Sequence, residues 1–257
     1  MTESSSKNLK GRKVSLFATC LIDSFFPDIG VATVKILRHL GVEVEFPKEQ
    51  TCCGQPAYNG GCREEALLVA EHFLDVFAGS EVIVSPSGSC VSMVKHEYPL
   101  LFKGDPKNYQ RALDVAGKIW ELSAFIVDGL GIEEMGGKLS EHCHFAFHDS
   151  CHGLRHLNLG PQARKLIGGI QNVEISELTD SDSCCGFGGL FSVKMSDVSG
   201  AMLQKKIDNI IDCKANTILL GDASCMMHIQ GGLDKQGYTK KVKHFASVLA
   251  EAISNEN

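Results

Sequence analysis

Eight of the eleven cysteines fall into two sets of four that share one internal spacing. In each set a single cysteine is followed, after 31 or 32 residues, by an adjacent pair and then, after 36 or 39 more, by a fourth cysteine. The first set is Cys20, Cys52, Cys53 and Cys90, and the second is Cys151, Cys184, Cys185 and Cys225. Counterparts lie 131 to 135 positions apart, which indicates two copies of one unit.

Four gathered thiols could hold a metal or an inorganic cluster. Zinc accepts four thiolates in a tetrahedron, but its usual Cys-x-x-Cys knuckles are absent from this chain. A disulfide redox pair normally shows the same short spacing. An iron–sulfur cluster tolerates adjacent cysteines better, because several irons offer several places for thiolates to bind. We therefore interpret the two sets as iron–sulfur or metal sites, with zinc still open in one of them.

The segments around the cysteines alternate between strand and helix patterns, which predicts an α/β protein with parallel sheets and crossover helices. The expected strands are 14–19, 42–46, 81–84, 145–147, 173–175 and 217–220, and the expected helices are 27–40, 63–77, about 106–130, 161–167 and about 197–211. Each repeated cysteine follows a strand or begins a helix. We therefore expect both sets at the carboxyl ends of the strands, where open sheets place their ligands.

A glycine-rich stretch at 131–137 has the composition of a linker. We expect two tandem, similar domains, each a small parallel sheet flanked by helices. The first would cover residues 1–132, with a disordered tail over about 1–10, and the second would cover residues 133–257.

Charge and composition exclude some classes of partner. The net charge of −6 over 257 residues argues against nucleic acid, while peripheral contact with a membrane stays open. Lys10, Arg12 and Lys13 precede an apolar run at 14–22 that resembles a weak secretory signal. We interpret this run as a buried first strand, because Cys20 at its end has a counterpart inside the chain. No run reaches the ~18 apolar residues of a membrane span, so we expect a soluble, cytoplasmic protein.

The motifs around the cysteines carry a resemblance that covers nearly the whole chain. They are Phe-Ala-Thr-Cys-Leu-Ile-Asp at 17–23, Gln-Thr-Cys-Cys-Gly-Gln-Pro-Ala at 50–57, Pro-Ser-Gly-Ser-Cys at 86–90, Cys-Cys-Gly-Phe-Gly-Gly at 184–189 and Gly-Asp-Ala-Ser-Cys-Met-Met-His at 221–228. Their arrangement resembles the tandem cysteine-rich CCG domain found in heterodisulfide reductase and in the glycolate oxidase iron–sulfur subunit. The details are most similar to the lactate-utilisation protein A family.

The resemblance implies an iron–sulfur electron-transfer subunit of a complex that oxidises L-lactate to pyruvate. It implies two partners, a ferredoxin-like iron–sulfur protein and a third subunit, and [4Fe–4S] clusters held by the eight cysteines. Alternative functions are a heterodisulfide- or quinone-reductase-type subunit, a glycolate oxidase subunit, and a zinc-stabilised scaffold without redox activity. The chain shows no flavin, nicotinamide or P-loop motif, so we do not expect it to turn over lactate alone.

The last cysteine of each set departs from the pattern of the wider family, which ends each motif in Cys-x-x-Cys. The first cysteine of that pair is replaced by Ser87 in one copy and by Asp222 in the other. This puts in doubt the five-cysteine cluster of heterodisulfide reductase. It also makes Ser87 and Asp222 candidate oxygen ligands.

Polar residues gather near the second set. We take His152 and Arg155 as candidates for holding a substrate carboxylate or bonding to cluster sulfur. Supporting positions around the cysteines are expected for His148, Asp149 and His228. The first copy has Phe17 and Leu21 in place of His148 and His152, so we expect unequal sites, with the second more reactive. The three cysteines without a counterpart are expected to be buried as small hydrophobes, and they are Cys62, Cys143 and Cys213.

Overall fold

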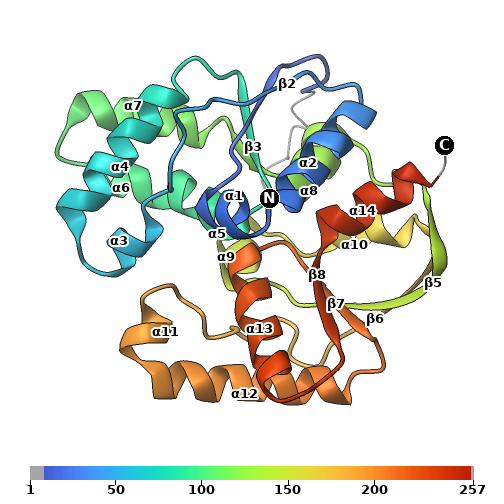
Figure 1. Ribbon diagram of the computed structural model, residues 1–257. Coiled ribbons are helices and arrows are strands. Elements are labelled where there is room, and N and C mark those ends of the chain that lie inside the picture. The colour runs from blue at the N-terminus through green and yellow to red at the C-terminus, as the bar shows by residue number, and fades with distance from the viewer. Residues whose placement is uncertain (1–8, 256–257) are drawn as a thin grey trace, which may run out of the picture.

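The computed structural model describes residues 9–255 and contains two four-stranded parallel sheets flanked by helices (Figure 1). This confirms the predicted tandem α/β fold. The strands of the first sheet are β1 (Val14–Leu16), β2 (Val44–Glu45), β3 (Val82–Ser85) and β4 (Ile119–Glu121). Those of the second are β5 (Lys138–Phe147), β6 (Gln171–Ser176), β7 (Thr217–Leu220) and β8 (Lys241–His244). Of the tail expected at residues 1–10, residues 1–8 lie outside the described part.

Both sheets have the same topology. The strand orders are β2-β1-β3-β4 and β6-β5-β7-β8, so the first strand of each copy pairs in parallel on both sides. A central strand is covered on both faces, and all three residues of β1 are buried. This confirms the interpretation of the run after Lys13 as a buried strand. Among residues 9–255 no helix has the length and apolar character to cross a membrane.

Helices connect the strands of each sheet. In the first copy they are α1 (Cys20–Phe25), α2 (Pro27–His39), α3 (Gln55–Asn59), α4 (Arg63–Val76), α5 (Gly88–Ser92), the π-helix η1 (Met93–Glu97), α6 (Tyr98–Leu101), α7 (Pro106–Ala116), α8 (Leu122–Ala124) and the π-helix η2 (Phe125–Gly129). In the second copy they are α9 (Cys151–Leu157), α10 (Pro161–Gly168), α11 (Phe191–Lys194), α12 (Ser196–Asp212), α13 (Ala223–Lys235) and α14 (Phe245–Ser254).

The predicted long helix over about 106–130 is wrong. Helix α7 ends at Ala116, and the chain then forms β4 before the short α8 and η2. Ile119 is fully buried between the sheet and its covering helices, which gives this three-residue segment its place as an edge strand. The helical periodicity on either side concealed the strand, because three residues are too few to show an alternation of their own.

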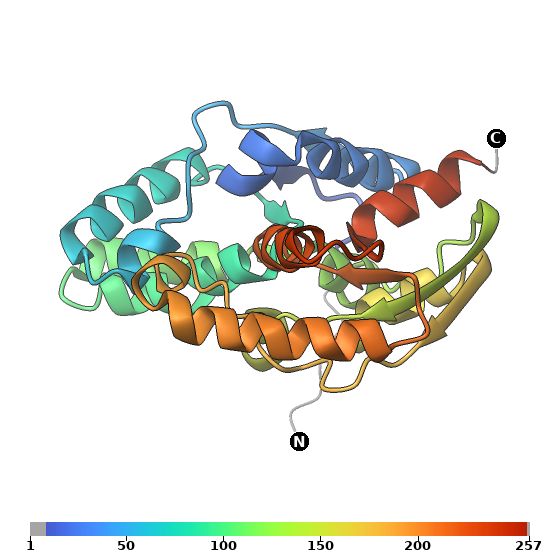
Figure 2. The same cartoon turned by 60° about the horizontal axis from the view of Figure 1, so that its bottom comes forward.

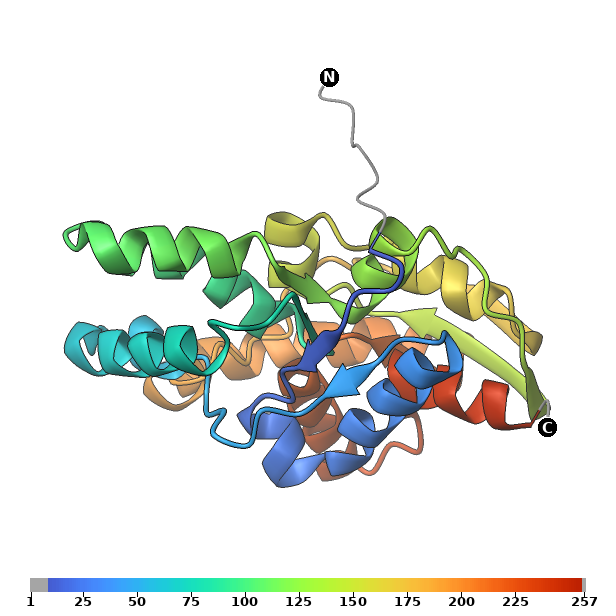
Figure 3. The ribbon, with the colours of Figure 1, turned by 90° about the horizontal axis from the view of Figure 1, so that it is seen from above.

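A shared core joins the two copies. One cluster of buried side chains runs from Val14 and Ile36 in the first copy to Phe147 and Leu249 in the second. Within it α2 packs beside α14, which Figures 2 and 3 show from two directions. Two further clusters belong mainly to one copy each, and they lie beneath the two sets of cysteine loops.

The loops at the carboxyl ends of the two sheets meet across the middle of the molecule. Helix α5 packs against α9, where Gly88 lies so close to Gly153 that a Cβ on Gly88 would be 3.4 Å from the Cα of Gly153. The Gly88 N–H donates to the carbonyl of Gly221 at 3.3 Å. The fold therefore brings the two cysteine sets to one place.

Candidate metal centre

All eight repeated cysteines line a single cavity of about 180 Å³. It lies between the two copies, where the loops after β1 to β3 face those after β5 to β7. The spacing of the cysteines predicted two sets at strand ends. It did not predict that the sets share one cavity.

Strained backbone precedes the first cysteine. Thr19 has φ 70° and ψ 153°, a conformation that β-branched residues rarely adopt, and it is followed directly by Cys20 at the start of α1. The Gln50 side chain braces this segment by accepting a hydrogen bond from the Ala18 N–H and donating one to the carbonyl of Leu16. The bracing holds Cys20 with its Sγ 3.6 Å from that of Cys52.

A glycine makes each adjacent cysteine pair possible. Gly54 has φ 80° and Gly186 has φ 90°, so the chain turns sharply after the pair. In both copies the glycine N–H points back and donates to the first sulfur of the pair, Cys52 or Cys184, at 3.4 Å. The turn therefore directs both thiols of each pair toward the cavity.

Burial divides each set in the same way. The second cysteine of each pair and the last cysteine of each set are buried, whereas the other two are partly exposed. In the second copy the buried sulfurs of Cys185 and Cys225 are 3.1 Å apart. One ring nitrogen of His148 lies within 4.8 Å of both sulfurs, a grouping that could hold a metal ion.

The electrostatics favour a thiolate at the first cysteine of each pair. Hydrogen bonds donated by Cys20 and Cys53 lower the pKa of Cys52 to about 3. Equivalent bonds, from Cys151 first, lower the pKa of Cys184 to about 2. A thiolate is the form that binds metal, so each set contains a sulfur suited to begin coordination.

Ser87 and Asp222 are both buried at the cavity wall. The Oγ of Ser87 lies 3.4 Å from that of Ser89. Asp222 caps α13, where Oδ1 accepts hydrogen bonds from the N–H and hydroxyl of Ser224, and its Oδ2 accepts from the Ser89 N–H of the other copy at 2.8 Å. Asp222 thus ties the two copies together, and its candidate role as an oxygen ligand stays a prediction.

The two candidate catalytic residues lie in different surroundings. His152 lines the cavity with its Nδ1 3.7 Å from the sulfur of Cys151, and burial lowers the pKa of its ring. Arg155 is exposed, and its guanidinium points to the carbonyl of Asp182 at 3.5 Å. The structure brings His152 to the thiols and leaves Arg155 outside the cavity wall.

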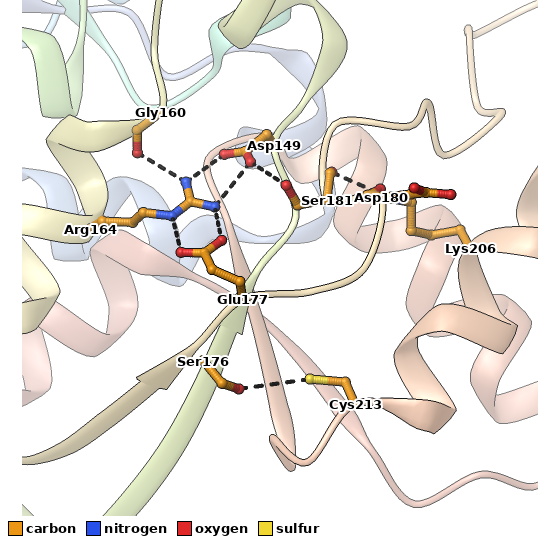
Figure 4. A network of polar contacts seen from close by, with 9 residues as sticks. All are labelled: Asp149, Gly160, Arg164, Ser176, Glu177, Asp180, Ser181, Lys206 and Cys213. Carbon is orange, nitrogen blue, oxygen red and sulfur yellow. Dashed lines mark hydrogen bonds and ion pairs between the residues drawn. The ribbon is translucent and has the colours of Figure 1, made fainter.

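His148 and Asp149 leave the end of β5 in different directions. The His148 ring is buried, and neither nitrogen has a hydrogen-bond partner among the described residues. Asp149 accepts two hydrogen bonds from Arg164 and one from Ser181, and Arg164 also pairs with Glu177 (Figure 4). Asp149 therefore anchors the loop that leads to Cys184, whereas His148 points a free nitrogen toward the thiols.

His228 lies behind the cavity rather than in its wall. Its ring contacts that of Phe187 at 5.7 Å between centroids, and its Nε2 is 3.5 Å from the Ser199 hydroxyl. Burial lowers the pKa of this histidine. It therefore supports the loop that follows the second pair.

The three cysteines without counterparts lie away from the cavity. Cys143 and Cys213 are partly buried against the hydrophobic clusters. Cys62 is exposed, so its predicted burial is wrong. It stands directly before α4, at the surface of the protein.

Sequence reasoning missed several residues at the site. Thr19 and Ser150 stand directly before the first cysteine of each set and line the cavity, and their shared offset of 131 could have revealed them. Lys206 is fully buried below the second cysteine loop. The sequence feature that could have revealed its burial is its position on the same face of α12 as the apolar Leu203 and Ile210.

Comparison with known proteins agrees with this geometry. A model of the cysteine-rich CCG domain matches residues 14–95 and 145–230. The chain is 48% identical to lactate utilization protein A of Exiguobacterium sp. over 93% of this chain and 98% of that protein. It is 47% identical to lactate utilization protein A of Macrococcus caseolyticus over 92% and 96%.

A solved structure shares the fold. A hypothetical protein from Helicobacter pylori superposes with a TM-score of 0.61 at 10% identity. The match covers all of this chain and 52% of that chain, so the present chain spans about half of it. At this identity the likeness concerns the fold alone.

Proposed function

The chain belongs to the cysteine-rich CCG domain family, as the lactate utilization protein A proteins to which it is similar indicate, and we propose its function from this membership. In our proposal the chain is an iron–sulfur electron-transfer subunit that serves the oxidation of L-lactate to pyruvate. In this proposal its partners are a ferredoxin-like iron–sulfur protein and a third subunit, and the complex works in the cytoplasm.

The shared cavity is the observation that carries the proposal. Eight thiols in two sets of four are a donor set suited to soft metals and iron–sulfur clusters. A structural zinc site closes around a single ion, whereas these thiols border about 180 Å³ of space. The free nitrogen of His148 beside Cys185 and Cys225 adds an unpaired buried donor to the second set. The residues therefore fit clusters better than single zinc ions.

Two cluster sites suit the oxidation of a 2-hydroxy acid. Lactate loses two electrons and two protons when it becomes pyruvate, and an iron–sulfur cluster supplies a place for one electron at a time. The chain's own part is to hold the sulfurs. Gly54 and Gly186 direct the thiolates of Cys52 and Cys184 inward. The buried Cys53 and its neighbours keep water from the inner side of the site.

Lactate itself is bound elsewhere in this proposal. No lysine or arginine is among the described residues that line the cavity, and His152 is its only basic side chain. A carboxylate beside eight thiols and Asp222 would have no guanidinium or ammonium to offset the repulsion of like charges. We therefore expect the isolated chain to show no lactate oxidation, because a partner must bind the substrate.

The test is the metal content of anaerobically purified protein. Wild-type protein is expected to be brown and to contain iron and acid-labile sulfide. Cys185→Ala should lose the iron of the second set and keep that of the first, since the first set has its own four thiols. Cys62→Ala removes an exposed thiol away from the cavity, so this control should keep the full iron content.

Other outcomes would point to other functions. Colourless protein that holds only zinc after reconstitution with iron and sulfide would replace the proposal with a zinc-stabilised scaffold. Lactate turnover by the isolated chain would contradict a role limited to electron transfer. A deletion strain that grows on lactate but fails on glycolate would assign the chain to a glycolate-oxidising complex.

A further inference from the structure

The two cysteine pairs rest on equivalent helices that differ in one buried residue. A Cβ on Gly54 would lie 3.6 Å from the carbonyl oxygen of Ala66 on α4, and one on Gly186 would lie 2.7 Å from that of Ser199 on α12. Ala66 and Ser199 therefore hold equivalent places. Seven residues further along each helix stand Phe73 and Lys206, and both are buried.

The floor of the first set is aromatic. The ring of Phe73 stacks on Phe77 at 4.4 Å between centroids and meets Phe17 edge-on at 4.9 Å. Tyr98 contacts the same ring at 5.5 Å and donates its hydroxyl to the carbonyl of Cys53. These rings belong to a cluster of buried apolar side chains, so the first set lies above an apolar floor.

The floor of the second set carries an amine. Lys206 is 0% exposed, and its Nζ donates to the carbonyl oxygens of Asp180 at 2.6 Å and Ser181 at 3.3 Å. Figure 4 shows Lys206, on α12, close to Asp180 and Ser181. These two residues belong to the loop that leads to Cys184 and Cys185. Both acceptors are backbone carbonyl oxygens, which carry no net charge to offset that of an ammonium group.

Two of the three neighbouring carboxylates are paired with other cations, and the third is Asp182. Asp180 pairs with Lys205 at 3.1 Å, and Asp149 binds Arg164 through both oxygens. Lys206 forms no ion pair with a carboxylate among residues 9–255. Burial lowers the pKa of its amine, and the nearby charges of Cys185 and the three aspartates act in the opposite direction. Of these charged groups, the thiol of Cys185 in the second set acts on Lys206 most strongly.

We propose that Lys206 makes the second cluster site easier to reduce than the first, so that electrons pass from the first set of cysteines to the second. This inference rests on the proposed function, because it requires a cluster at each set. A cluster gains one negative charge when it is reduced, and a cation in a buried setting stabilises that charge strongly. In the transfer one electron leaves the reduced first site and reduces the second, and no bond is formed or broken.

The first test compares the two sites without changing Lys206. Cys53→Ala leaves only the second set complete, and Cys185→Ala leaves only the first. Each reconstituted variant is titrated with reductant, and the cluster signal is followed by electron paramagnetic resonance. The second site, measured in Cys53→Ala, is expected to have a higher midpoint potential than the first site, measured in Cys185→Ala. The expected difference is at least about 59 mV, which corresponds to a tenfold change in the redox equilibrium for one electron. Equal potentials, or the reverse order, would overturn the proposal.

The second test changes the charge. Lys206→Met keeps a long apolar side chain and removes the ammonium group. It should lower the midpoint potential of the second site by an amount that changes its redox equilibrium at least tenfold, and it should leave the potential of the first site unchanged. Lys206→Arg should restore most of the difference. Lys205→Met is the matched control, since this neighbour is exposed on the same helix, and both potentials should stay as in the wild type.

Iron content separates the two levels of failure. If wild-type protein binds no iron or sulfide, the proposed function fails and the inference fails with it. If the clusters are present and Lys206→Met leaves the second potential unchanged, only the role of Lys206 is refuted.

Discussion

Glu121 and His244 occupy equivalent positions in the two copies, but the first is an acid and the second is a base. Each is the last residue of its edge strand, is buried, and caps the following helix with its side chain. Oε2 of Glu121 accepts from the N–H and hydroxyl of Ser123, while Oε1 has no partner among the described residues. His244 contacts the carbonyl of Pro86 in the other copy at 3.0 Å. The two caps therefore give the molecule opposite responses to pH.

Replacement of Glu121 should change how the stability of the protein depends on pH. Burial raises the pKa of Glu121 to about 7 from the ordinary 4.5, so between these pH values the folded state holds a proton that the unfolded chain has released. Stability is then lost as pH rises through this window, by about 3 kcal/mol in all. Glu121→Gln removes the titration and should be increasingly more stable than the wild type from pH 5 to pH 7, as measured by urea unfolding.

The comparison needs the histidine and a surface control. Burial lowers the pKa of His244 to about 4, so its contribution runs the other way and stability is lost as pH falls from about 6.5 toward 4. This contribution is the same in the wild type and in Glu121→Gln, and it cancels in their difference. Glu251→Gln on the exposed side of α14 should follow the wild-type curve. A difference that does not change with pH would refute the buried ionisation of Glu121.

At the scale of elements, the crossing of α5 and α9 sets the distance between the two cysteine sets. A Cβ on Gly153 would lie 2.8 Å from the Ser150 hydroxyl, in front of Cys151. Gly153→Ala should therefore push the Ser150 hydroxyl out of its position in front of Cys151, at a cost of about 1 kcal/mol, and should lower the iron retained per chain. Urea unfolding and iron analysis of the same samples measure both effects.

A glycine of α12 provides the matched control. Gly200 is exposed inside this helix, and a Cβ there would meet nothing within 4 Å. Gly200→Ala should stabilise the protein by about 0.4–1 kcal/mol through the lower entropy of the unfolded chain, with unchanged iron content. Equal behaviour of Gly200→Ala and Gly153→Ala would show that the position of Ser150 has no part in holding the metal site.

The elements also show what the sequence could predict. Six of the eight strands were predicted, because their apolar runs end at turn residues or cysteines. The edge strand β4 was missed between helical patterns, and β8 was missed because Val242, between Lys241 and Lys243, is its only apolar residue. The eight cysteines were found from their spacing. Their common cavity was not, since the packing of α2 on α14 that joins the copies depends on contacts between residues more than two hundred positions apart.

At the scale of the whole molecule, two similar copies are joined into one structure. The shared core connects α2 of the first copy with α14 of the second. The cavity lies on the same boundary, and Asp222 and His244 reach across it to Ser89 and Pro86. Separation of the copies would break both the core and the metal site. The division into two domains near residues 131–137 stays a prediction, and the shared core makes joint unfolding of both copies the expected behaviour.

The last prediction concerns this joint stability. Because one core spans both copies, the full chain should unfold in a single cooperative transition rather than in two steps. The single tryptophan, Trp120, lies on β4 and reports on the first copy by fluorescence, while circular dichroism at far-ultraviolet wavelengths reports on the helices of both. The two probes should give the same urea midpoint. A fluorescence transition clearly separated from the loss of helix would show that each copy is stable by itself, and would make the shared core a weak contact between two domains.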